Sequence, residues 1–532
     1  MKKSEIRNPK HETNSNDQNS KYQNDSNLKH SNFKRFLPTI LIIFILVIGA
    51  FFRLYRIREY LTFLGDEGRD VLVVKRMIVD GKLTLLGPIT SVGSIYMGPV
   101  YYYMMAPFLL LAGFDPVGPA VMVALFGVGT IALIYVLMKQ FFDDFAALSA
   151  SFLYAVSPLP ILYGRASWNP NVVPFFATVL IYSLLQSCLA GKTKWLIFAG
   201  FALGILVQLH YVTFLFFPVI AIMLFLYRKV LNKKDFLAGF AAFLLSYSPF
   251  LIFELRHGFV NTLGAWRFLW QQKAEAAPGL LAIWSTIHDV SVRLFWRLVV
   301  VESAEITKIF MIFLAATVYI KIRNLKKLGS KGAVTILLVW LIVGIVSFGL
   351  YRGVIYDYYL GSLFTLPFIF TGIALSSLFQ FKKYGKVFSL GILIVLALFN
   401  LKHSPLLTPP SNLMRNTQEA ARFVFEQSQG LPYNFALIAG KNSDHAYRYF
   451  LELWGAAPVT VENPTIDPQR TTVTNQLFVV CEEEVCQPEG HPLWEIAGYG
   501  RAEIENEWKV ATVRIFKLVP FRGYTRLTLV PI

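Results

Sequence analysis

The residues best suited to chemistry form one acidic segment, Gly65-Asp66-Glu67-Gly68-Arg69-Asp70, directly after the first apolar run of the chain. A carboxylate here can act as general base on an acceptor hydroxyl while a sugar leaves a phosphate carrier. Only one base is needed, because the phosphate departs as an anion. If a helix begins near Asp66, Asp70 lies one turn later on the same face. A helix N-terminus weakens a carboxylate as a base, so orientation of the acceptor must supply much of the catalysis. The alternative is that these acids only cap an interfacial helix.

A departing phosphate also needs cations, and arginine suits this role because its planar guanidinium grips phosphate oxygens in bidentate fashion. Arg165, in the turn Arg165-Ala166-Ser167-Trp168-Asn169-Pro170, is the first candidate. The alternative explanation is that the Arg165 side chain only snorkels to the membrane surface, with Trp168 as an interfacial anchor. Further candidates at the outer ends of apolar runs are Arg256, His257 and Arg352 for the phosphate, with Arg69, Asp70, Tyr101, Asn169, His210, Tyr356 and Asp357 as accessory residues.

Each of these further candidates also has an ordinary structural explanation. Glu254 can pair with Arg256, and the tyrosines near Arg352 can belong to an interfacial aromatic belt. A lone His210 at a helix end is commonly a hydrogen-bonded terminus rather than a catalytic group. Both interpretations stay open for every one of them.

No metal site can be assigned from the sequence, because no histidine lies at ligand spacing from Asp66, Glu67 and Asp70. A divalent cation, Mg²⁺ or Mn²⁺, stays open as a cofactor, since a cation held by one carboxylate and a phosphate needs few protein ligands. The chain has no glycine-rich phosphate-binding loop, which disfavours a nucleotide-sugar donor.

The composition indicates that most of the chain lies in lipid. Of its 532 residues 55% are hydrophobic and only 16% are charged, which argues against a set of soluble domains. The net charge of +17 comes from lysine and arginine in short loops between apolar runs. Such loops are topology signals, so nucleic acid is not an expected partner. Residues 1–35 are polar and predict a disordered cytoplasmic tail.

Apolar runs long enough for a membrane recur from Phe36 to Leu401. Gly98–Phe114 is short and opens with Gly-Pro; a span there would place four later lysine- and arginine-rich loops outside the cell, against the positive-inside rule. We therefore expect it to lie in the outer interface or to re-enter. About eleven spans remain, with the N-terminus inside. They are Phe36–Phe52, Pro119–Leu137, Phe145–Leu162, Val172–Ala190, Trp195–Tyr211, Thr213–Tyr227, Phe236–Phe253, Thr307–Ile322, Val334–Leu350, Tyr358–Phe379 and Val387–Leu401.

The polar remainder, residues 404–532, predicts one soluble domain, which an odd number of spans places outside the cell. A helix is expected at Thr417–Gln427, and strands are expected at Phe435–Ala439, Gln476–Val480 and Ala511–Leu518, which predicts an α/β or α+β fold. Cys481 and Cys486 are either a disulfide or two free thiols.

An Asp-Glu pair in the first external loop, before an interfacial segment and a membrane bundle, resembles the GT-C superfamily, in particular its protein O-mannosyltransferase and aminoarabinose transferase branch. The resemblance covers roughly Phe36 to Leu401 and extends to the Arg165–Pro170 turn. At Tyr96-Met97-Gly98-Pro99-Val100-Tyr101 the chain departs from the Lys-Pro-Pro-Leu that the branch often has. The resemblance implies that Asp66 is the catalytic carboxylate and Glu67 its partner. It also implies juxtamembrane helices in the first loop of a GT-C-like bundle of about eleven spans.

The expected function is therefore that of an integral membrane glycosyltransferase. It would transfer a sugar from a polyprenyl-phosphate carrier to the hydroxyl of an extracytoplasmic protein, lipid or glycan. The expected location is the plasma membrane, with membrane lipid as a further partner. Two alternatives stay open, a lipid-linked-sugar flippase or transporter and a non-catalytic membrane assembly protein. A flippase would place ionisable residues at mid-membrane in broken helices, whereas here they lie at span ends.

Overall fold

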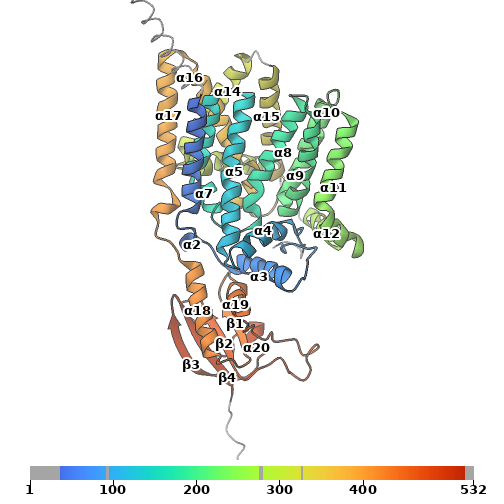
Figure 1. Cartoon of the computed structure of the whole chain (residues 1–532), viewed down its shortest axis with the longest axis vertical. Helices are drawn as coiled ribbons and strands as arrows, with labels where there is room; N and C mark the ends of the chain where they lie inside the picture. Colours follow the sequence, from blue (N-terminus) through green and yellow to red (C-terminus); the bar gives the residue numbers. More distant parts are fainter. Residues whose placement is uncertain (1–35, 91–94, 275–278, 325–327, 522–532) are drawn as a thin grey trace, which may run out of the picture.

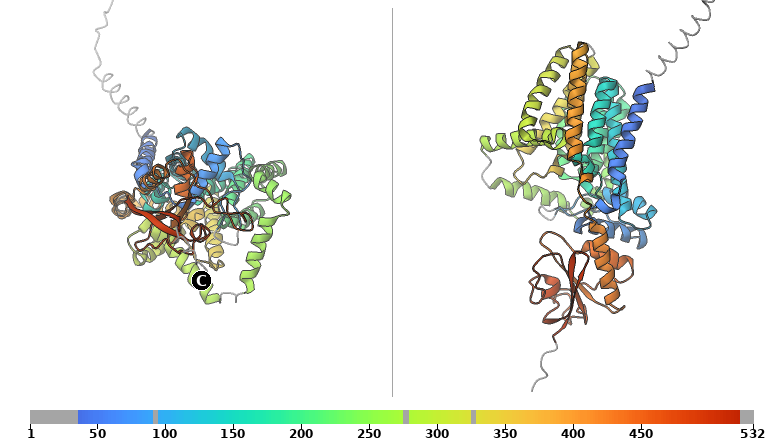
Figure 2. Two further views of the ribbon diagram at one scale, coloured as in Figure 1. Left: turned by 90° about the horizontal axis from the view of Figure 1, so that it is seen from below. Right: turned by 90° about the vertical axis from the view of Figure 1, so that its left-hand side faces the viewer.

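The protein is a bundle of helices that stands on a smaller unit containing a β-sheet (Figure 1). The computed structural model describes residues 36–90, 95–274, 279–324 and 328–521, so the predicted tail 1–35 lies outside it. Viewed from the side, the orange and red C-terminal unit occupies one end of the helical part (Figure 2). A layer of short helices, which includes α2, α3 and α4, separates the two.

The helical part follows the apolar runs of the sequence. Its first helix is Phe36–Leu54. The next elements are α2 (Ile57–Tyr60), α3 (Gly65–Val79), α4 (Val100–Leu111), α5 (Val117–Phe141), α6 (Asp144–Val156), α7 (Pro158–Tyr163), α8 (Val173–Cys188), α9 (Leu196–Leu209), α10 (Phe216–Leu226), α11 (Lys233–Arg256), α12 (Val260–Ala274), α13 (Leu280–Phe295), α14 (Ala304–Asn324), α15 (Leu328–Gly349), α16 (Thr365–Phe379) and α17 (Lys382–Lys402). Short turns precede or follow several of them, at η1 (Asn169–Val172), η2 (Thr193–Trp195), η3 (Tyr211–Leu215), η4 (Trp296–Val300), η5 (Asp357–Leu363) and η6 (Pro405–Leu407).

Every predicted span coincides with a helix or a pair of helices, and the chain is a multi-pass membrane protein. Among the described residues, six helices are long and apolar enough to cross a membrane, or seven if η5 and α16, bent by 55°, form one span. The others fall short individually. The predicted span Phe145–Leu162 is divided into α6 and α7 because Pro158 cannot donate a helical hydrogen bond.

The segment expected not to span contains α4, which has 12 residues. A helix of that length extends roughly 18 Å, well short of an apolar core about 30 Å thick. It packs between α3 on one side and α5 and α9 on the other. The helix α3, which the sequence predicts to begin near Asp66, is sandwiched between α4 and the C-terminal unit.

The C-terminal unit is a four-stranded mixed sheet with the order β1-β2-β4-β3. Its strands are β1 (Asn434–Ile438), β2 (Leu477–Cys481), β3 (Ala502–Val510) and β4 (Val513–Pro520), and its helices are α18 (Leu413–Gln427), α19 (His445–Leu453) and α20 (Trp494–Ala497). The strand β1 is parallel to β2, and the other two pairs are antiparallel. The predicted α/β or α+β class is confirmed, while β3 and α19 were not foreseen. Cys481 and Cys486 form a disulfide.

Candidate active site

The acidic segment forms the first turn of α3, and Asp66 and Glu67 point to different surroundings. The helix begins at Gly65, one residue before Asp66, close to where a helix was expected. The Asp66 side chain is 56% exposed and lines a cavity of about 300 Å³. Ligand pockets in proteins begin at roughly this size. Asp66 therefore offers a carboxylate to a space large enough for a small molecule.

Glu67 is instead buried and serves the helix itself. Its Oε2 accepts a hydrogen bond of 3.2 Å from the backbone N–H of Leu64, which is one of the donors that a helix start leaves without a partner. Burial raises the pKa of this carboxyl to about 7. The capping interpretation thus describes Glu67, whereas Asp66 faces the cavity. The catalytic partnership that the resemblance implies for Glu67 stays a prediction.

Arg69 links the two aspartates of the segment. Its Nη1 donates to Asp66 Oδ1 at 2.9 Å, while its Nε and Nη2 donate to Asp70 Oδ1 at 3.0 and 2.8 Å. The same Asp70 oxygen accepts from the Tyr102 hydroxyl at 3.0 Å. Burial raises the pKa of Asp70 to about 6, against the lowering effect of Arg69. Asp70 is thus a fixed anchor for Arg69, and Arg69 in turn orients Asp66.

Aromatic and amide side chains form the opposite wall of the cavity. Trp168 and Asn169 come from the turn before α8, His210 and Tyr211 from the junction of α9 and η3, and Tyr358 and Tyr359 from η5. Their rings contact one another, with centroids 4.4 Å apart for Trp168 and Tyr358 and 5.0 Å apart for His210 and Tyr359. Such a wall combines apolar faces with hydroxyl and amide edges, and it matches a sugar, whose ring has C–H faces and hydroxyl edges.

Hydrogen bonds hold two of these wall residues in place. The Asn169 amide donates to the carbonyl of Leu209, and His210 Nδ1 accepts from the backbone N–H of Val212 at 3.2 Å. The ordinary interpretation of His210 as a hydrogen-bonded helix end is therefore correct, and the residue also lines the cavity.

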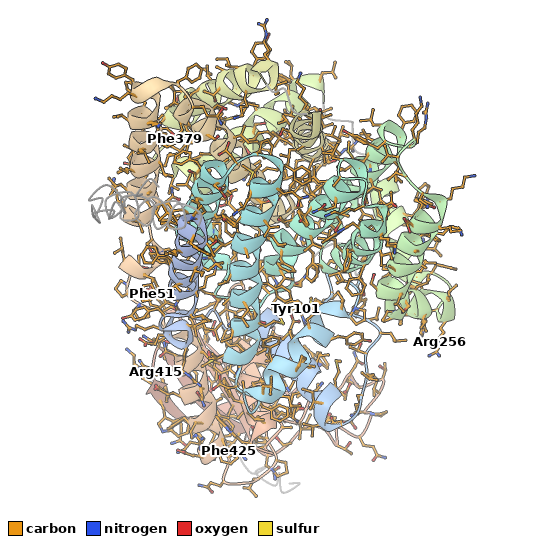
Figure 3. All side chains as sticks on the ribbon, turned by 45° about the horizontal axis from the view of Figure 1, so that its top comes forward. Phe51, Tyr101, Arg256, Phe379, Arg415 and Phe425 are labelled. Carbon is orange, nitrogen blue, oxygen red and sulfur yellow. A yellow bond between two sulfur atoms is a disulfide. The ribbon has the colours of Figure 1, made fainter. Side chains whose placement is uncertain are left out.

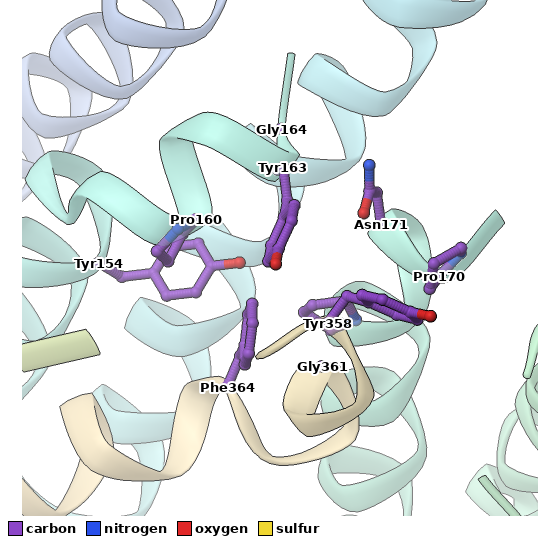
Figure 4. A pocket seen from close by; sticks show the side chains of 11 residues that line it. Tyr154, Pro160, Tyr163, Gly164, Pro170, Asn171, Tyr358, Gly361 and Phe364 are labelled. Atoms are coloured by element: carbon purple, nitrogen blue, oxygen red, sulfur yellow. The ribbon is translucent and has the colours of Figure 1, made fainter. Parts of the chain in front are cut away.

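A second, much smaller void lies behind this wall. It measures about 10 Å³, enough for a single water, and shares Pro170 and Tyr358 with the larger cavity. The rings of Tyr163, Tyr358 and Phe364 surround it, with Asn171 at its rim (Figure 4). It is too small for a sugar or a phosphate, so the larger cavity beside Asp66 is the candidate active site.

Arg165 and Tyr101 make their contacts outside the cavity. The Arg165 guanidinium donates to the carbonyls of Phe52 and Tyr55 at 2.6 and 2.7 Å, which ties this turn to the end of the first helix. The buried Tyr101 hydroxyl lies 2.9 Å from Ser167 Oγ. Neither residue lines the cavity in the described part of the chain, so their predicted roles find no support in this arrangement.

The remaining predicted cations do not line the cavity either. Arg256 is at the edge of the molecule, apart from Tyr101 (Figure 3), and His257 stacks on Phe253 with ring centroids 4.1 Å apart. Glu254 accepts hydrogen bonds from Asn261 and Thr262, so it caps α12 instead of pairing with Arg256. Arg352 is not among the residues that line the cavity.

Two predicted accessory residues lie at the start of η5. Asp357 accepts from Arg297 Nε at 2.9 Å, so its charge is already paired. Tyr356 stacks on Tyr358, with an interplanar angle of 10°. It therefore supports the aromatic wall from behind and does not line the cavity.

The cation that the structure brings to the cavity is Arg69, which the sequence had suggested only as an accessory residue. Within the described ranges, no three His, Cys, Asp or Glu side chains gather as a metal cluster, and the cavity offers Asp66 as its carboxylate. The sequence did not single out Tyr211, Tyr358 and Tyr359 as site residues, because interfacial tyrosines are common in membrane proteins. Their position beside His210 follows only from the fold.

Comparisons with known proteins agree with this architecture. Residues 97–253 match the family described as dolichyl-phosphate-mannose-protein mannosyltransferase. A stretch of 156 residues is 30% identical to YkcB of Bacillus subtilis (strain 168), which is provisionally assigned as a mannosyltransferase. This match takes in 28% of the present chain and only 22% of YkcB.

Two solved structures share the fold. ArnT from Cupriavidus metallidurans, bound to undecaprenyl phosphate, superposes with a TM-score of 0.59 at 12% identity over 90% of this chain and 97% of its own. The Archaeoglobus fulgidus oligosaccharyltransferase tethered to an acceptor peptide gives a TM-score of 0.51 at 12% identity over 84% of this chain and 69% of its own. The chain thus has the fold of ArnT, and its segment at residues 97–253 matches a mannosyltransferase family.

Proposed function

We propose that this protein is a membrane glycosyltransferase that transfers a sugar from a polyprenyl-phosphate carrier to an acceptor hydroxyl, with Asp66 as general base. One observation carries the proposal. An exposed carboxylate at the start of α3 shares a cavity of about 300 Å³ with an arginine and an aromatic wall. The undecaprenyl phosphate bound by ArnT, which shares this fold, supports a polyprenyl-phosphate donor.

In this reaction Asp66 accepts the proton of the acceptor hydroxyl as the acceptor oxygen attacks the anomeric carbon. The bond between that carbon and the phosphate oxygen breaks, and its electron pair leaves with the polyprenyl phosphate. The leaving phosphate needs no protonating acid. Arg69 is the cation in the cavity that stabilises the negative charge. The proton on Asp66 then passes to water.

The aromatic wall has a separate task in the proposal. Trp168 and Tyr358 hold the apolar face of the sugar, and Asn169 and the tyrosine hydroxyls hold its edges. Holding the sugar in one orientation contributes more to the rate than the basicity of a carboxylate. The reason is that donor and acceptor then react within one complex and need not meet by diffusion.

The orientation in the membrane follows from charge in this proposal. The helix α17 runs from the far end of the bundle to the C-terminal unit (Figure 1), and it begins with Lys382 and Lys383 at that far end. The positive-inside rule makes the lysine-rich end cytoplasmic. The cavity, α3 and the C-terminal unit then face the extracytoplasmic side, where the acceptor protein, lipid or glycan is bound.

If the reaction requires a divalent cation, Asp66 and the donor phosphate would hold it, and it would neutralise the phosphate charge, because oxygen ligands suit Mg²⁺ or Mn²⁺. Dialysis of the membranes against EDTA tests for such a cation. If transfer is lost and either Mg²⁺ or Mn²⁺ restores it, a divalent cation takes part. Unchanged transfer would mean that Arg69 balances the charge of the donor phosphate without a metal ion.

The function is tested with Asp66→Asn, which keeps size and shape but removes the base. We expect transfer in membranes supplied with a polyprenyl-phosphate sugar to fall by roughly 10²–10⁴-fold, the usual contribution of a general base. Asp80→Asn is the matched control, because Asp80 ends the same helix and lies outside the cavity. Wild-type transfer by the Asp66 variant would remove Asp66 as the base. Mass spectrometry of envelope glycans and lipids with and without the protein identifies the sugar and acceptor.

A further inference from the structure

The first turn of α3 is only partly capped by residues of its own helix. The residue before the helix is Leu64, which has no side-chain oxygen with which to accept a hydrogen bond. Glu67 takes the Leu64 N–H, but the next donor, the N–H of Gly65, needs another acceptor. That N–H belongs to the residue directly before Asp66, so its partner fixes the backbone that carries the proposed base.

The missing acceptor comes from the C-terminal unit, 377 residues further along the chain. The Gly65 N–H donates to Oδ1 of Asn442 at 2.8 Å. The same oxygen accepts from the N–H of Ser443 at 2.9 Å. Asn442 thus does for α3 what an N-cap residue normally does from within the helix.

Asn442 is itself held in one orientation by Glu482. The Asn442 Nδ2 donates to both oxygens of Glu482, at 2.9 and 3.0 Å, and the Tyr447 hydroxyl donates to Glu482 at 2.8 Å. Glu482 follows directly on Cys481, the last residue of β2, and the disulfide to Cys486 closes the short loop that begins with it. The chain of contacts therefore runs from the sheet to the base.

Close packing along the rest of α3 supports this contact. A side chain at Gly68 would lie 2.3 Å from the backbone nitrogen of Ala446, so α19 touches the helix backbone directly. Further along, Lys75 and Arg76 form ion pairs with Glu452 at 3.1 and 2.6 Å. These contacts dock the helix, while Asn442 acts at its first turn.

We propose that Asn442 is a positioning residue through which the C-terminal unit holds Asp66 in its reactive place, with Glu482 and the adjacent disulfide fixing Asn442. The role rests on the proposed function, because it assumes that Asp66 reacts. It assigns the soluble unit a part in catalysis that does not require it to touch donor or acceptor. Loss of the contact should lower kcat more than it changes donor KM, because a displaced base still leaves the cavity wall intact.

The proposal is tested by changing the charge at Asn442 and then at Glu482, while both side chains keep their size. Asn442→Asp keeps an oxygen for Gly65 but places a second carboxylate against Glu482, so the pair is pushed apart. We expect kcat to fall roughly tenfold, with donor KM within about twofold. Adding Glu482→Gln restores a donor opposite the new carboxylate, and the double variant should recover kcat to within about threefold of wild type. Asn506→Asp, on the exposed far strand β3, is the matched control and should change neither parameter.

Hydrogen–deuterium exchange of the full-length protein in nanodiscs gives a readout that is independent of activity. The amides of Gly65 to Gly68 should exchange faster in Asn442→Asp and return toward wild type in the double variant, while β1 and β2 stay protected. If Asp66→Asn retains transfer but exchange behaves as stated, the proposed function fails and the contact stands. Wild-type kcat and exchange in Asn442→Asp, or no recovery in the double variant, would overturn the positioning role.

Discussion

The substitution Glu67→Gln distinguishes the structural role of Glu67 from the proposed catalytic role of its neighbour Asp66. Glu67 is only 8% exposed, and its carboxylate accepts the Leu64 N–H. Burial raises its pKa from 4.5 to about 7. A glutamine keeps the size and one acceptor oxygen but has no charge to bury. The substitution therefore removes the ionisation of Glu67 while it leaves the helix cap in place.

The size of the effect follows from the change in pKa. The difference between 7 and 4.5 is 2.5, which corresponds to about 3 kcal/mol of preference for the neutral form. Between these two pH values the folded protein binds more protons than the unfolded chain, so wild-type stability falls as the pH rises through this interval. The variant has no such dependence. Relative to wild type it should be similar at pH 5 and more stable by up to about 3 kcal/mol at pH 8.

The assay is thermal unfolding of purified wild type and variant in detergent at several values from pH 5 to pH 8. With an unfolding entropy of roughly 2.1 cal/mol/K per residue, 3 kcal/mol corresponds to a Tm gain of about 3 °C at the upper end. Transfer should persist in Glu67→Gln, in contrast to Asp66→Asn. A pH-independent difference would refute the burial argument, and loss of transfer would assign Glu67 a direct part in the reaction.

Three further predictions concern the cavity and its orientation. Arg69→Lys keeps the positive charge but loses the forked guanidinium that bridges Asp66 and Asp70. We expect kcat/KM to fall about 10- to 100-fold, which corresponds to roughly 1.4–2.8 kcal/mol. Arg76→Lys, on the same helix, should leave kcat/KM near the wild-type value. Arg165→Lys removes bonds to the carbonyls of Phe52 and Tyr55; its Tm should fall while donor KM stays constant, and a raised donor KM would instead support the phosphate-binding role. Leu83 and Tyr384 are 75% and 77% exposed, so each can be replaced by cysteine and labelled with an impermeant maleimide. The cysteine at position 83 should be labelled in intact cells, and the cysteine at position 384 only after lysis. The reverse pattern would invert the proposed topology.

The sequence predicts the membrane part well wherever apolar periodicity and charge act locally. Uninterrupted apolar runs predict α5 and α11, and Pro107 with its Gly-Pro start marks the short α4. The resemblance to the GT-C superfamily, which depended on Asp66 and Glu67, agrees with the ArnT-like fold and with the family match at residues 97–253. The exact limits of the spans are harder to predict from the sequence, because the bend between η5 and α16 leaves no distinct signal in an apolar run.

The composition of the cavity could not be predicted in the same way. The sequence favours Arg165 as the phosphate-binding cation because guanidinium groups suit phosphate, yet only the fold reveals that its guanidinium donates to backbone carbonyls. The tyrosines of η5 approach His210 from another helix, over about 150 residues of intervening sequence. The contact of Asn442 with Gly65 spans 377 positions, and no local pattern indicates such a pair.

The junction of α3 with the C-terminal unit also imposes an order on biosynthesis. The ribosome delivers α3 long before the sheet that supports it, since β1 and β2 lie more than 360 residues beyond Gly65. The membrane helices can insert while the chain is still growing, but the support for the first turn of α3 arrives only when Asn442 has been synthesised. A nascent chain therefore carries its acidic turn without the restraint found in the finished protein. Maturation of the site is therefore a late event, which waits for synthesis of the segment that contains Asn442.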